Sequence, residues 1–481
     1  MLVSLSFGQS KRGLAYGYHS AKDLEVLSPE ISWWYNWSEA PESAVADVYA
    51  NYGFEFVPMT WNGNFNATKL RNFLSKHPET KYLLAFNEPN FIDQANMKPS
   101  EVAAKWSVLE AIADEYNLKI VGPAVNYCGN CVEENGTTYT DPFKYLDDFF
   151  AACTGCRVDY IAVHSYINTV SALKWYIDKF RKYNKPIWLT EFAGWEPNGN
   201  INNIDDQINF MIGAVDFLDT DPDVFRYSWF IGRGSGISKY PYIDILGADG
   251  TLTALGEVYK QMPLHDENKI VDIPATIEAE AYNKMSGILL EKTADASGFA
   301  NVGYIEAGDW LEYKIRVPVG DNYSVLFRIA ATKSASMNVL IDGTRVLTQA
   351  FSNTGGWQNW STFENSMDLT EGVHTIRFQA VTNGFNINWF QIGNTLAVGD
   401  MLDDENDRIH IFPNPTSHML NIKINDFSEC QVRISDLMGK TMIDRSINKS
   451  GGIDISGLEK GFYTVIVTNN EFVSVKKIII Q

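Results

Sequence analysis

The sequence predicts an α/β fold for its first half, a (β/α)8 TIM barrel, followed by a β-sandwich (jelly-roll) domain and a small C-terminal β-sandwich domain. Two observations carry this prediction. Within residues 11–264, short apolar strand-like runs alternate with amphipathic helical runs, and eight such repeats in about 250 residues are typical of this barrel. After Pro263, short alternating strands separated by Gly, Asp and Asn replace the helical pattern.

The predicted barrel strands are largely apolar on both faces, as expected for strands that helices cover. They are GLAYGYH (13–19), EISWWYNW (30–37), FEFVPMTW (54–61), YLLAFNEP (82–89), KIVGPAVN (119–126), VDYIAVHSY (158–166), PIWLTEFA (186–193) and FRYSWFI (225–231). Helical runs lie between them, for example from Pro99 and from Thr169. No glycine-rich phosphate loop follows the first strand, which argues against a dinucleotide-binding fold.

The remaining domain boundaries follow from changes in composition. Residues 1–10 are short and apolar, and we interpret them as the remnant of a signal peptide or a disordered lead. The barrel is expected over residues 11–264 and the first β domain over 275–394. An acidic linker is expected over 395–408 and the last β domain over 409–481.

Charge and composition restrict the possible partners. Acidic residues outnumber basic ones by 59 to 39, and the formal net charge of -20 repels nucleic acid and anionic membrane surfaces. No run of about 18 apolar residues is present, so we expect no membrane insertion. Aromatic residues make up 13% of the chain, and flat rings exposed in grooves commonly hold the apolar faces of sugars. The composition therefore favours a carbohydrate ligand.

Two carboxylates end predicted barrel strands at the same level. Glu88 ends the fourth strand in YLLAFNEPN, and Glu191 ends the seventh in WLTEFAGW. Active sites of such barrels lie at the carboxyl ends of the strands. Two facing carboxylates can cleave a glycosidic bond, because one protonates the leaving oxygen and the other attacks the anomeric carbon. A strand end with a solvated Glu is the competing interpretation of Glu88 alone.

Further polar and aromatic side chains accompany this pair. Asn87 could donate a hydrogen bond to a sugar hydroxyl near the anomeric carbon. His164 and Tyr166, at the end of the sixth strand, could contact Glu191 or a sugar, although a histidine on an apolar run is more often a satisfied core residue. Four tryptophans near strand ends could stack on sugar rings, with one or two serving only barrel packing: Trp34, Trp61, Trp195 and Trp229.

The first domain carries seven motifs, in order, that resemble glycoside hydrolase family 128 of clan A: GLAYGYH, WWYNW, VPMTWN, AFNEPN, VGPAVNY, CRVDYIAVHSY and WLTEFAGW. The resemblance implies a retaining endo-β-1,3-glucanase that acts on laminarin or curdlan without a cofactor. It implies that Glu88 is the acid/base and Glu191 the nucleophile. Two alternatives stay open. The same carboxylates could act on xylan or mixed-linkage glucan, or the barrel could be an inactive part of a glycan-binding adhesin.

The first β domain resembles carbohydrate-binding module family 6 in the motifs IEAEAYNKMSG, VGYIEAGDWLEYKI, NTGGWQNWSTF and GFNINWFQIG. The resemblance implies a glycan site with an aromatic pair at Tyr304 and Trp357 and with Asn388 as the polar partner. Glu278 and Glu280 are expected on one side of a strand, where like charges repel. We expect a structural Ca2+ ion there, since oxygen ligands suit it. A solvated strand face is the alternative.

The last domain resembles the C-terminal sorting domain of the type IX secretion system of Bacteroidota, most clearly in IFPNPTSHMLNIKI. This resemblance implies a secreted or cell-surface protein that the secretion machinery recognises. A small interaction domain is the alternative. We expect the protein to be a monomer with a β-glucan polysaccharide as its partner.

Four of the five cysteines form two C-x2-C pairs, Cys128 with Cys131 and Cys153 with Cys156. The spacing is that of a zinc ribbon. The predicted barrel, however, places the first pair at its top and the second at its bottom, so one ion could not reach all four. In an exported protein we expect two local disulfides, while spacing alone leaves a reduced form open. Cys430 is expected to be a buried thiol.

Overall fold

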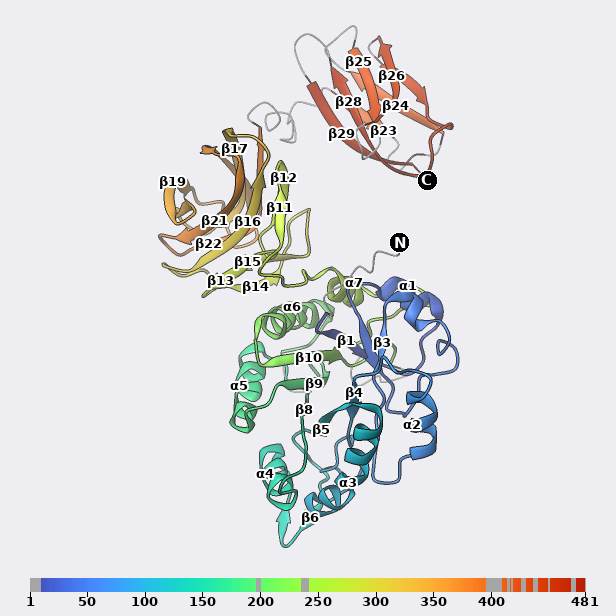
Figure 1. The fold of residues 1–481 in the computed structure, drawn as a ribbon. Helices are drawn as coiled ribbons and strands as arrows, with labels where there is room; N and C mark the ends of the chain where they lie inside the picture. Colours follow the sequence, from blue (N-terminus) through green and yellow to red (C-terminus); the bar gives the residue numbers. More distant parts are fainter. Residues whose placement is uncertain are drawn as a thin grey trace.

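The computed structural model describes residues 10–195, 200–234 and 242–394. Of the last domain it describes residues 409–412, 416, 418–424, 430–435, 440–448, 450–468 and 473–480. The predicted lead, apart from residue 10, and the predicted linker at 395–408 therefore lie outside the described residues. Figure 1 shows an α/β domain followed along the chain by two β domains.

The first domain is built on a curled sheet of eight parallel strands in the order β3-β2-β1-β10-β9-β8-β5-β4. The strands are β1 (Arg12–Ala15), β2 (Trp33–Tyr35), β3 (Glu55–Phe56), β4 (Tyr82–Leu84), β5 (Lys119–Val125), β8 (Tyr160–Ser165), β9 (Ile187–Phe192) and β10 (Val224–Trp229). Hydrogen bonds from Thr60 N to Leu84 O (2.9 Å) and from Leu84 N to Pro58 O (3.0 Å) link the two edges of the sheet. All eight strands that the sequence predicts are present.

Helices cover the outside of this sheet (Figure 1). They are α1 (Ala21–Leu27), α2 (Ala67–Leu74), α3 (Pro99–Tyr116), α4 (Pro142–Ala152), α5 (Val170–Phe180), α6 (Ile204–Thr220) and α7 (Ala254–Gln261), with the 3-10 turns η1 (Tyr49–Tyr52) and η2 (Arg181–Tyr183) and the hairpin strands β6 (Glu133–Glu134) and β7 (Thr137–Thr138). Asn66, Thr169 and Asn203 begin α2, α5 and α6 by accepting a hydrogen bond from a backbone N–H in the first turn. Among the described helices, none is long and apolar enough to cross a membrane.

Aromatic rings and one arginine fill the inside of the sheet. The guanidinium carbon of Arg226 lies 4.8 Å from the ring centre of Tyr82, 5.0 Å from that of Trp188 and 5.5 Å from that of Trp33. Arg226 also pairs with Glu55 at 2.6 Å, so its buried charge is compensated. This packed interior leaves room for a site only where the strands end.

The second domain contains two β-sheets, in the orders β11-β16-β21-β18-β19 and β14-β15-β22-β17-β20. β13 pairs with β16, and β12 pairs with β22. The ring of Phe390 lies 4.7 Å from those of Tyr313 and Phe378, so the two sheets share one apolar core. The strands are β11 (Ile270–Asp272), β12 (Ala275–Glu278), β13 (Lys284–Ser286), β14 (Leu289–Lys292), β15 (Ala300–Gly303), β16 (Trp310–Val317), β17 (Asp321–Ala331), β18 (Ala335–Ile341), β19 (Thr344–Phe351), β20 (Trp360–Leu369), β21 (Gly372–Ala380) and β22 (Phe385–Asn394).

The last domain has a core of its own. Its sheets have the orders β23-β24-β27 and β26-β25-β28-β29. The strands are β23 (Ile409–Phe412), β24 (Met419–Ile424), β25 (Cys430–Ser435), β26 (Thr441–Ile447), β27 (Ser450–Asp454), β28 (Gly461–Thr468) and β29 (Val473–Ile480). Cys430 belongs to this core as a buried free thiol, as predicted.

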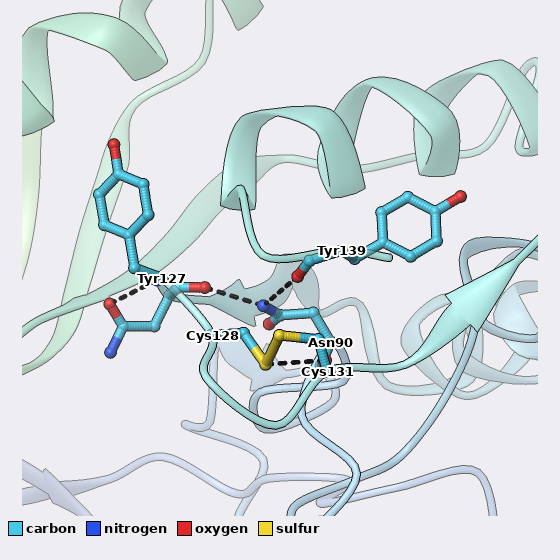
Figure 2. The surroundings of a disulfide bond; sticks show 6 residues. Asn90, Tyr127, Cys128, Cys131 and Tyr139 are labelled. Carbon is cyan, nitrogen blue, oxygen red and sulfur yellow. Dashed lines mark hydrogen bonds between the residues drawn. A yellow bond between two sulfur atoms is a disulfide. The ribbon is translucent and has the colours of Figure 1, made fainter. Parts of the chain in front are cut away.

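Both predicted disulfides are present, Cys128–Cys131 and Cys153–Cys156. Figure 2 shows the first of them beside Asn90, whose side-chain amide donates to the carbonyl oxygens of Asn126 (2.8 Å) and Tyr139 (3.4 Å). Cys128 and Cys131 follow β5, and Asn90 follows β4. The disulfide loop therefore supports the segment that leaves the end of β4. Because the four thiols are used in disulfides, no zinc ribbon forms.

Arg12 supplies a test of the barrel packing. Its fully buried guanidinium pairs with Asp219 at 2.9 Å and donates to the carbonyl oxygens of Tyr259 (2.7 Å) and Met262 (3.0 Å). We expect Arg12→Ala to lower the free energy of unfolding by about 3–5 kcal/mol, because it leaves a buried carboxylate without its partner. Guanidinium unfolding would measure this. The exposed pair of Arg316 gives the control, since Arg316→Ala should cost less than about 1 kcal/mol. Equal losses would contradict the expectation.

Candidate active site

Glu88 and Glu191 lie together where the parallel strands end. One carboxylate oxygen of each and a ring nitrogen of His164 all lie within 4.8 Å of one another. Nδ1 of His164 is 2.9 Å from Oε1 of Glu88 and 3.3 Å from Oε2 of Glu191. All three side chains are buried. The structure thus brings two carboxylates and one imidazole, from three different strands, into a single cluster.

The backbone at Glu88 departs from the strand abruptly. Glu88 has φ of 42°, in the left-handed region that residues other than glycine seldom adopt. Asn87 N still donates to Trp61 O at 2.9 Å, whereas Phe91 N donates to the carbonyl oxygen of Glu88 at 3.0 Å, in a turn. Pro89 has no N–H and cannot continue a ladder. The chain therefore turns at the carboxylate, beyond the end of β4 at Leu84 and the last bridge at Asn87.

Several hydrogen-bond donors converge on Glu191. Nε1 of Trp37 lies 2.8 Å from Oε1, the hydroxyl of Tyr35 lies 3.0 Å from the same oxygen, and the hydroxyl of Tyr166 donates to Oε2. Burial raises the pKa of Glu191, while His164 and the donors Tyr166 and Trp37 act to lower it. These donors favour the ionised form and fix the orientation of the carboxylate.

His164 is the side chain that contacts both carboxylates. Burial by itself would lower its pKa, but Glu191 and Glu88 outweigh this effect and raise the pKa above the ordinary value. Among the described residues, its buried Nε2 has no hydrogen-bond partner. His164 is buried as a core histidine would be, yet its Nδ1 contacts both acids. Its place is therefore in the site and not only in the core.

A cavity of about 700 Å³ opens over the carboxylates. Its lining is Trp37, Trp61, Asn87, Glu88, Phe91, Asp93, Gln94, Asn126, Tyr127, Tyr166, Ile167, Glu191, Trp195, Phe230 and Ile231. The ring of Trp195 stacks on that of Tyr166, with ring centres 3.6 Å apart and planes 11° apart. The side-chain amide of Asn87 lies 3.4 Å from Oε1 of Gln94, and its own oxygen has no partner among the described residues. Aromatic walls with few polar groups are typical of small-molecule and sugar sites.

Two of the four predicted tryptophans do not reach this cavity. Trp34 is fully buried against Tyr49 and Phe56, and Trp229 is fully buried with Nε1 donating to the carbonyl oxygen of Ile243 at 2.8 Å. Both belong to the core that joins sheet and helices, which is the packing role that the sequence left open for one or two of the four. Trp61 and Trp195 do line the cavity.

Sequence reasoning missed Tyr35 and Trp37 as partners of Glu191. In β2, Trp33 and Tyr35 face the inside of the sheet and Trp34 faces the helices, because side chains alternate along a strand. Applying that alternation to WWYNW would have selected Tyr35. Trp37 has φ of 57°, and its side chain turns back toward Glu191 from beyond the strand. No pattern in the sequence signals that turn.

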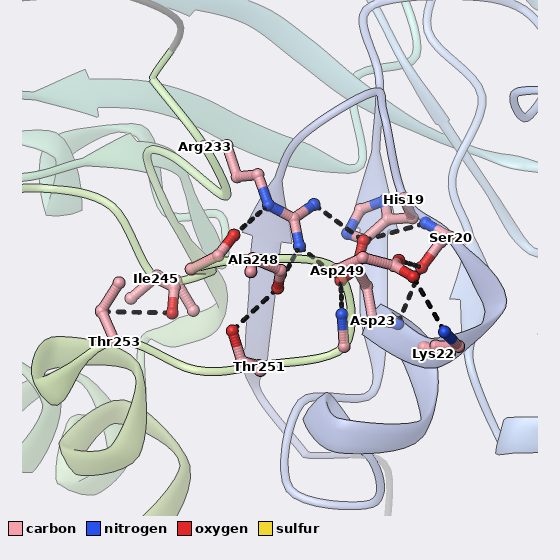
Figure 3. Close-up of polar contacts among 12 residues, drawn as sticks. His19, Ser20, Lys22, Asp23, Arg233, Ile245, Ala248, Asp249, Thr251 and Thr253 are labelled. Atoms are coloured by element: carbon pink, nitrogen blue, oxygen red, sulfur yellow. Dashed lines mark hydrogen bonds and ion pairs between the residues drawn. The ribbon is translucent and has the colours of Figure 1, made fainter.

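An ion pair holds the segment that follows β10 (Figure 3). Arg233 donates to both carboxylate oxygens of Asp23, at 2.8 Å and 2.5 Å, and to the carbonyl oxygen of Gly247 at 2.6 Å. Burial alone would raise the pKa of Asp23, but Arg233 and backbone N–H groups hold it at about 2. The ion pair ties the segment carrying Phe230 and Ile231, which line the cavity, to the start of α1.

The second domain exposes the predicted aromatic pair but not the predicted amide. Tyr304 is 62% exposed and Trp357 is 50% exposed. The amide of Asn388 donates to Asp295 at 2.8 Å and to the carbonyl oxygen of Ser297 at 3.2 Å, so the structure does not place it beside the exposed rings. The amide beside Trp357 belongs instead to a residue two positions earlier.

That residue is Asn386, whose amide donates to Trp357 O at 2.9 Å and to Oε1 of Glu291 at 2.8 Å. Its side-chain oxygen has no partner among the described residues. Asn386 and Asn388 share one face of β22, because they are two residues apart. Both are buried (1% and 0% exposed), so the hydrogen-bond partners of each amide, which the alternation does not reveal, decide which one lies beside the aromatic pair.

The predicted calcium ligands are one half-buried acid, Glu278, and one buried acid, Glu280, and both have free oxygens. Glu278 ends β12 and Glu280 lies just beyond it. Burial raises the pKa of both and brings that of Glu280 to about 8. Within the described residues, Oε2 of Glu278, both oxygens of Glu280 and Oδ1 of Asn388 lack hydrogen-bond partners. Oε2 of Glu278 and Oδ1 of Asn388 lie 3.5 Å and 3.4 Å from the place that a Cβ on Gly298 would take. Such a set of oxygen donors fits a hard cation.

The fold and the site define an α/β protein with a carboxylate pair in an aromatic cleft at the ends of its parallel strands. The chain belongs to the family described as the glycosyl hydrolase catalytic core, whose model matches residues 13–259. Residues 278–394 match the carbohydrate binding module of family 6, and residues 410–481 match a secretion system C-terminal sorting domain. The sorting domain indicates export by the type IX system to the cell surface or beyond.

Curated relatives match parts of the chain. Alkali-sensitive linkage protein 1 of Schizosaccharomyces pombe is 29% identical over 261 residues, 52% of this chain and 44% of that protein. The clotting factor G alpha subunit of Tachypleus tridentatus is 32% identical over 121 residues, 24% of this chain and 18% of that protein. The chain therefore spans less than half the length of these relatives.

Two solved structures are similar to separate domains. A family 128 (subgroup II) endo-β-1,3-glucanase from Sorangium cellulosum is 42% identical, covering 53% of this chain and 99% of that chain, with a TM-score of 0.47. A carbohydrate-binding module from Cellvibrio mixtus lichenase 5A, in complex with cellotriose, is 36% identical, covering 25% of this chain and 98% of that chain, with a TM-score of 0.24.

The contact between Trp37 and Glu191 gives a test of the site. Trp37→Phe removes a hydrogen bond to a charged group, worth about 1.5–3 kcal/mol. We expect kcat/KM for a β-glucan oligosaccharide to fall about 10- to 100-fold. We also expect the acidic limb of its pH profile to move to higher pH, because the lost donor favoured ionised Glu191. Trp34→Phe, in the core, is the matched control and should leave the profile in place. An unshifted profile in the Trp37 variant would contradict the assigned role.

Proposed function

We propose that the protein is a secreted, retaining endo-β-1,3-glucanase that hydrolyses laminarin- or curdlan-type glucans and carries an appended glycan-binding module. The observation that carries this proposal is the cluster of Glu88, His164 and Glu191 at the mouth of an aromatic cleft. The seven barrel motifs that resemble glycoside hydrolase family 128 support the linkage.

The spacing of the carboxylates supports a retaining mechanism. Retaining glycosidases hold their two carboxyl groups about 5–5.5 Å apart, and inverting ones about 6.5–9.5 Å apart to leave room for a water molecule. Here an oxygen of Glu88 lies within 4.8 Å of an oxygen of Glu191. Little space remains for water between the acids, so direct attack by one of them is favoured.

The proposed reaction proceeds in two displacements. First, a carboxylate oxygen of Glu191 bonds to the anomeric carbon while the bond to the bridging oxygen breaks, and Glu88 gives its proton to that oxygen. Then Glu88 takes a proton from water, the water oxygen bonds to the anomeric carbon, and Glu191 leaves. His164 contacts both acids and is proposed to hold them in position. The donors on Glu191 hold it in the orientation for attack.

The cleft residues then have separate roles in binding. Trp61 and Trp195 line the cavity and are proposed to stack on glucosyl rings. The amide of Asn87, beside the acid, is proposed to bind a hydroxyl next to the anomeric carbon, a contact that strengthens in the transition state. Tyr166 is proposed to orient Glu191 through the hydrogen bond from its hydroxyl. Its ring is proposed to hold Trp195 in place by stacking.

We further propose a structural Ca2+ ion in the second domain, with no cofactor for catalysis. Glu278 and Asn388 would hold it through their free oxygens, and Glu280 would add a nearby carboxylate. When bound, the ion neutralises acids that burial otherwise disfavours as anions. This role is structural and lies apart from the glycosidic chemistry.

Hydrolysis products test the substrate and the roles of the acids. We expect laminarin and curdlan to release laminari-oligosaccharides whose new ends first appear in the β configuration by NMR. Glu191→Ala with azide should form an α-glycosyl azide, and Glu88→Ala should form the β product, because azide replaces a nucleophile in one case and water in the other. Release from xylan or mixed-linkage glucan alone would contradict the substrate. Binding without any release would favour a glycan-binding adhesin.

The pH dependence of calcium binding tests the structural ion. Without Ca2+, the raised pKa of Glu280, about 8, means that the stability it contributes is full below about pH 4.3 and is lost as pH rises through about 8. We expect EGTA to lower the melting temperature at pH 8 much more than at pH 5, since the ion holds the ionised acid. Glu280→Gln should show no such pH-dependent loss in EGTA. A melting temperature that does not change on removal of Ca2+ at either pH would refute the site.

A further inference from the structure

We propose that the catalytic cleft and the aromatic pair of the second domain form one continuous track for a single glucan chain, which crosses between the two domains at the first turn of α6. The inference rests on the proposed function, because it takes a β-glucan as the ligand of the cleft. Three sets of contacts carry it: those that fix the second domain on α6, those that join α6 to the cleft, and those that join α6 to the aromatic pair.

Helix α6 fixes the second domain. The backbone N–H of Lys292, in β14, donates to Oδ1 of Asn209 at 2.8 Å, and its ammonium pairs with Asp205 in the first turn of α6. Further along the helix, the hydroxyl of Tyr282 donates to Asp216. One apolar core runs through both domains, and Figure 1 shows β14 beside α6. The second domain is therefore docked along the helix and not merely tethered to the barrel.

The first turn of α6 adjoins the cleft. Helix α6 follows β9, the strand that carries Glu191, and a helix that follows a barrel strand begins at the end of the barrel where the site lies. The buried side chain of Gln207 donates from Nε2 to the carbonyl oxygen of Gly194 at 2.9 Å. Gly194 precedes Trp195, which lines the cleft. The second domain thus contacts α6 at the end of the helix next to the cleft wall.

The aromatic pair lies on the same contact. Glu291 precedes Lys292 in β14 and accepts hydrogen bonds from Asn386, which also donates to the carbonyl oxygen of Trp357. Oε1 of Glu291 is 3.2 Å from the place that a Cβ on Gly303 would take, and Tyr304 follows directly. Both exposed rings are therefore carried by residues around Glu291, the chain neighbour of Lys292, whose side chain contacts α6 from the other face of β14.

One chain bound at both places gains affinity by effective concentration. Two linked sites that one ligand spans can bind it more tightly than either site alone, and the gain disappears for ligands too short to span them. Because docking on α6 holds the two sites in one arrangement, the gain should set in at a definite chain length. A module on a flexible tether would show no such threshold.

Hydrolysis of a ladder of laminari-oligosaccharides, of about 5 to about 20 glucosyl units, tests this track. We expect kcat/KM of the full-length protein to step up roughly tenfold once the chain spans both sites. In Trp357→Ala, the ratio of long-chain to short-chain kcat/KM should fall to about one. Trp175→Ala, which removes an equally exposed tryptophan (50%) from the outside of α5, is the matched control and should keep the step. The inference would be overturned if kcat/KM changed with chain length without a step, and in the same way, in all three proteins.

A variant that disrupts the contact between the second domain and α6 tests whether the long-chain step depends on the arrangement of the two sites. Asp205→Lys places like charges against Lys292 at an exposed position. We expect this variant to lose the long-chain step while it keeps short-chain hydrolysis and retention on insoluble curdlan. A step that survives Asp205→Lys would also overturn the inference. No hydrolysis of any chain length by the unaltered protein would instead refute the proposed function, so the two failures are distinguishable.

Discussion

The contact of one buried histidine with two buried carboxylates is the constraint on which the rest of the structure depends. Burying a carboxylate costs several kcal/mol unless the group is paired. His164 is the shared partner, because its Nδ1 contacts both Glu88 and Glu191. Everything around the three residues serves to hold them at this distance: the left-handed turn at Glu88, the hydrogen-bond donors on Glu191 and the packed interior below.

Different contacts support the site from below, inside the sheet, and from the loops above. Arg226 and the rings around it close the inside of the sheet, so the site rests on a floor without free space. The loops above are held by specific contacts and not by bulk packing: the disulfide loop beside Asn90, and the ion pair of Arg233 with Asp23. A cleft built this way keeps its shape without a ligand, which reduces the entropy lost when a sugar chain binds.

Much of the fold could be read from local patterns, whereas parts of the site could not. Eight apolar runs predicted the strand count, and the NEP and TEF motifs predicted Glu88 and Glu191. The patterns failed where packing decides what a side chain contacts. Trp34 lies in β2 yet faces the helices, and Asn388 shares a strand face with Asn386 yet its amide bonds to Asp295 and not to Trp357.

The sequence by itself determined the order of domains, the alternation of strands and helices, the acids at the strand ends and the two cysteine pairs, because each depends on residues that are near one another in the chain. Only the tertiary structure decided which groups meet. Some of these contacts join residues far apart in sequence. Trp37 and Tyr35 donate hydrogen bonds to Glu191, and the backbone N–H of Lys292 donates to Asn209 in α6. Such contacts depend on how strands and domains pack, which no local pattern encodes.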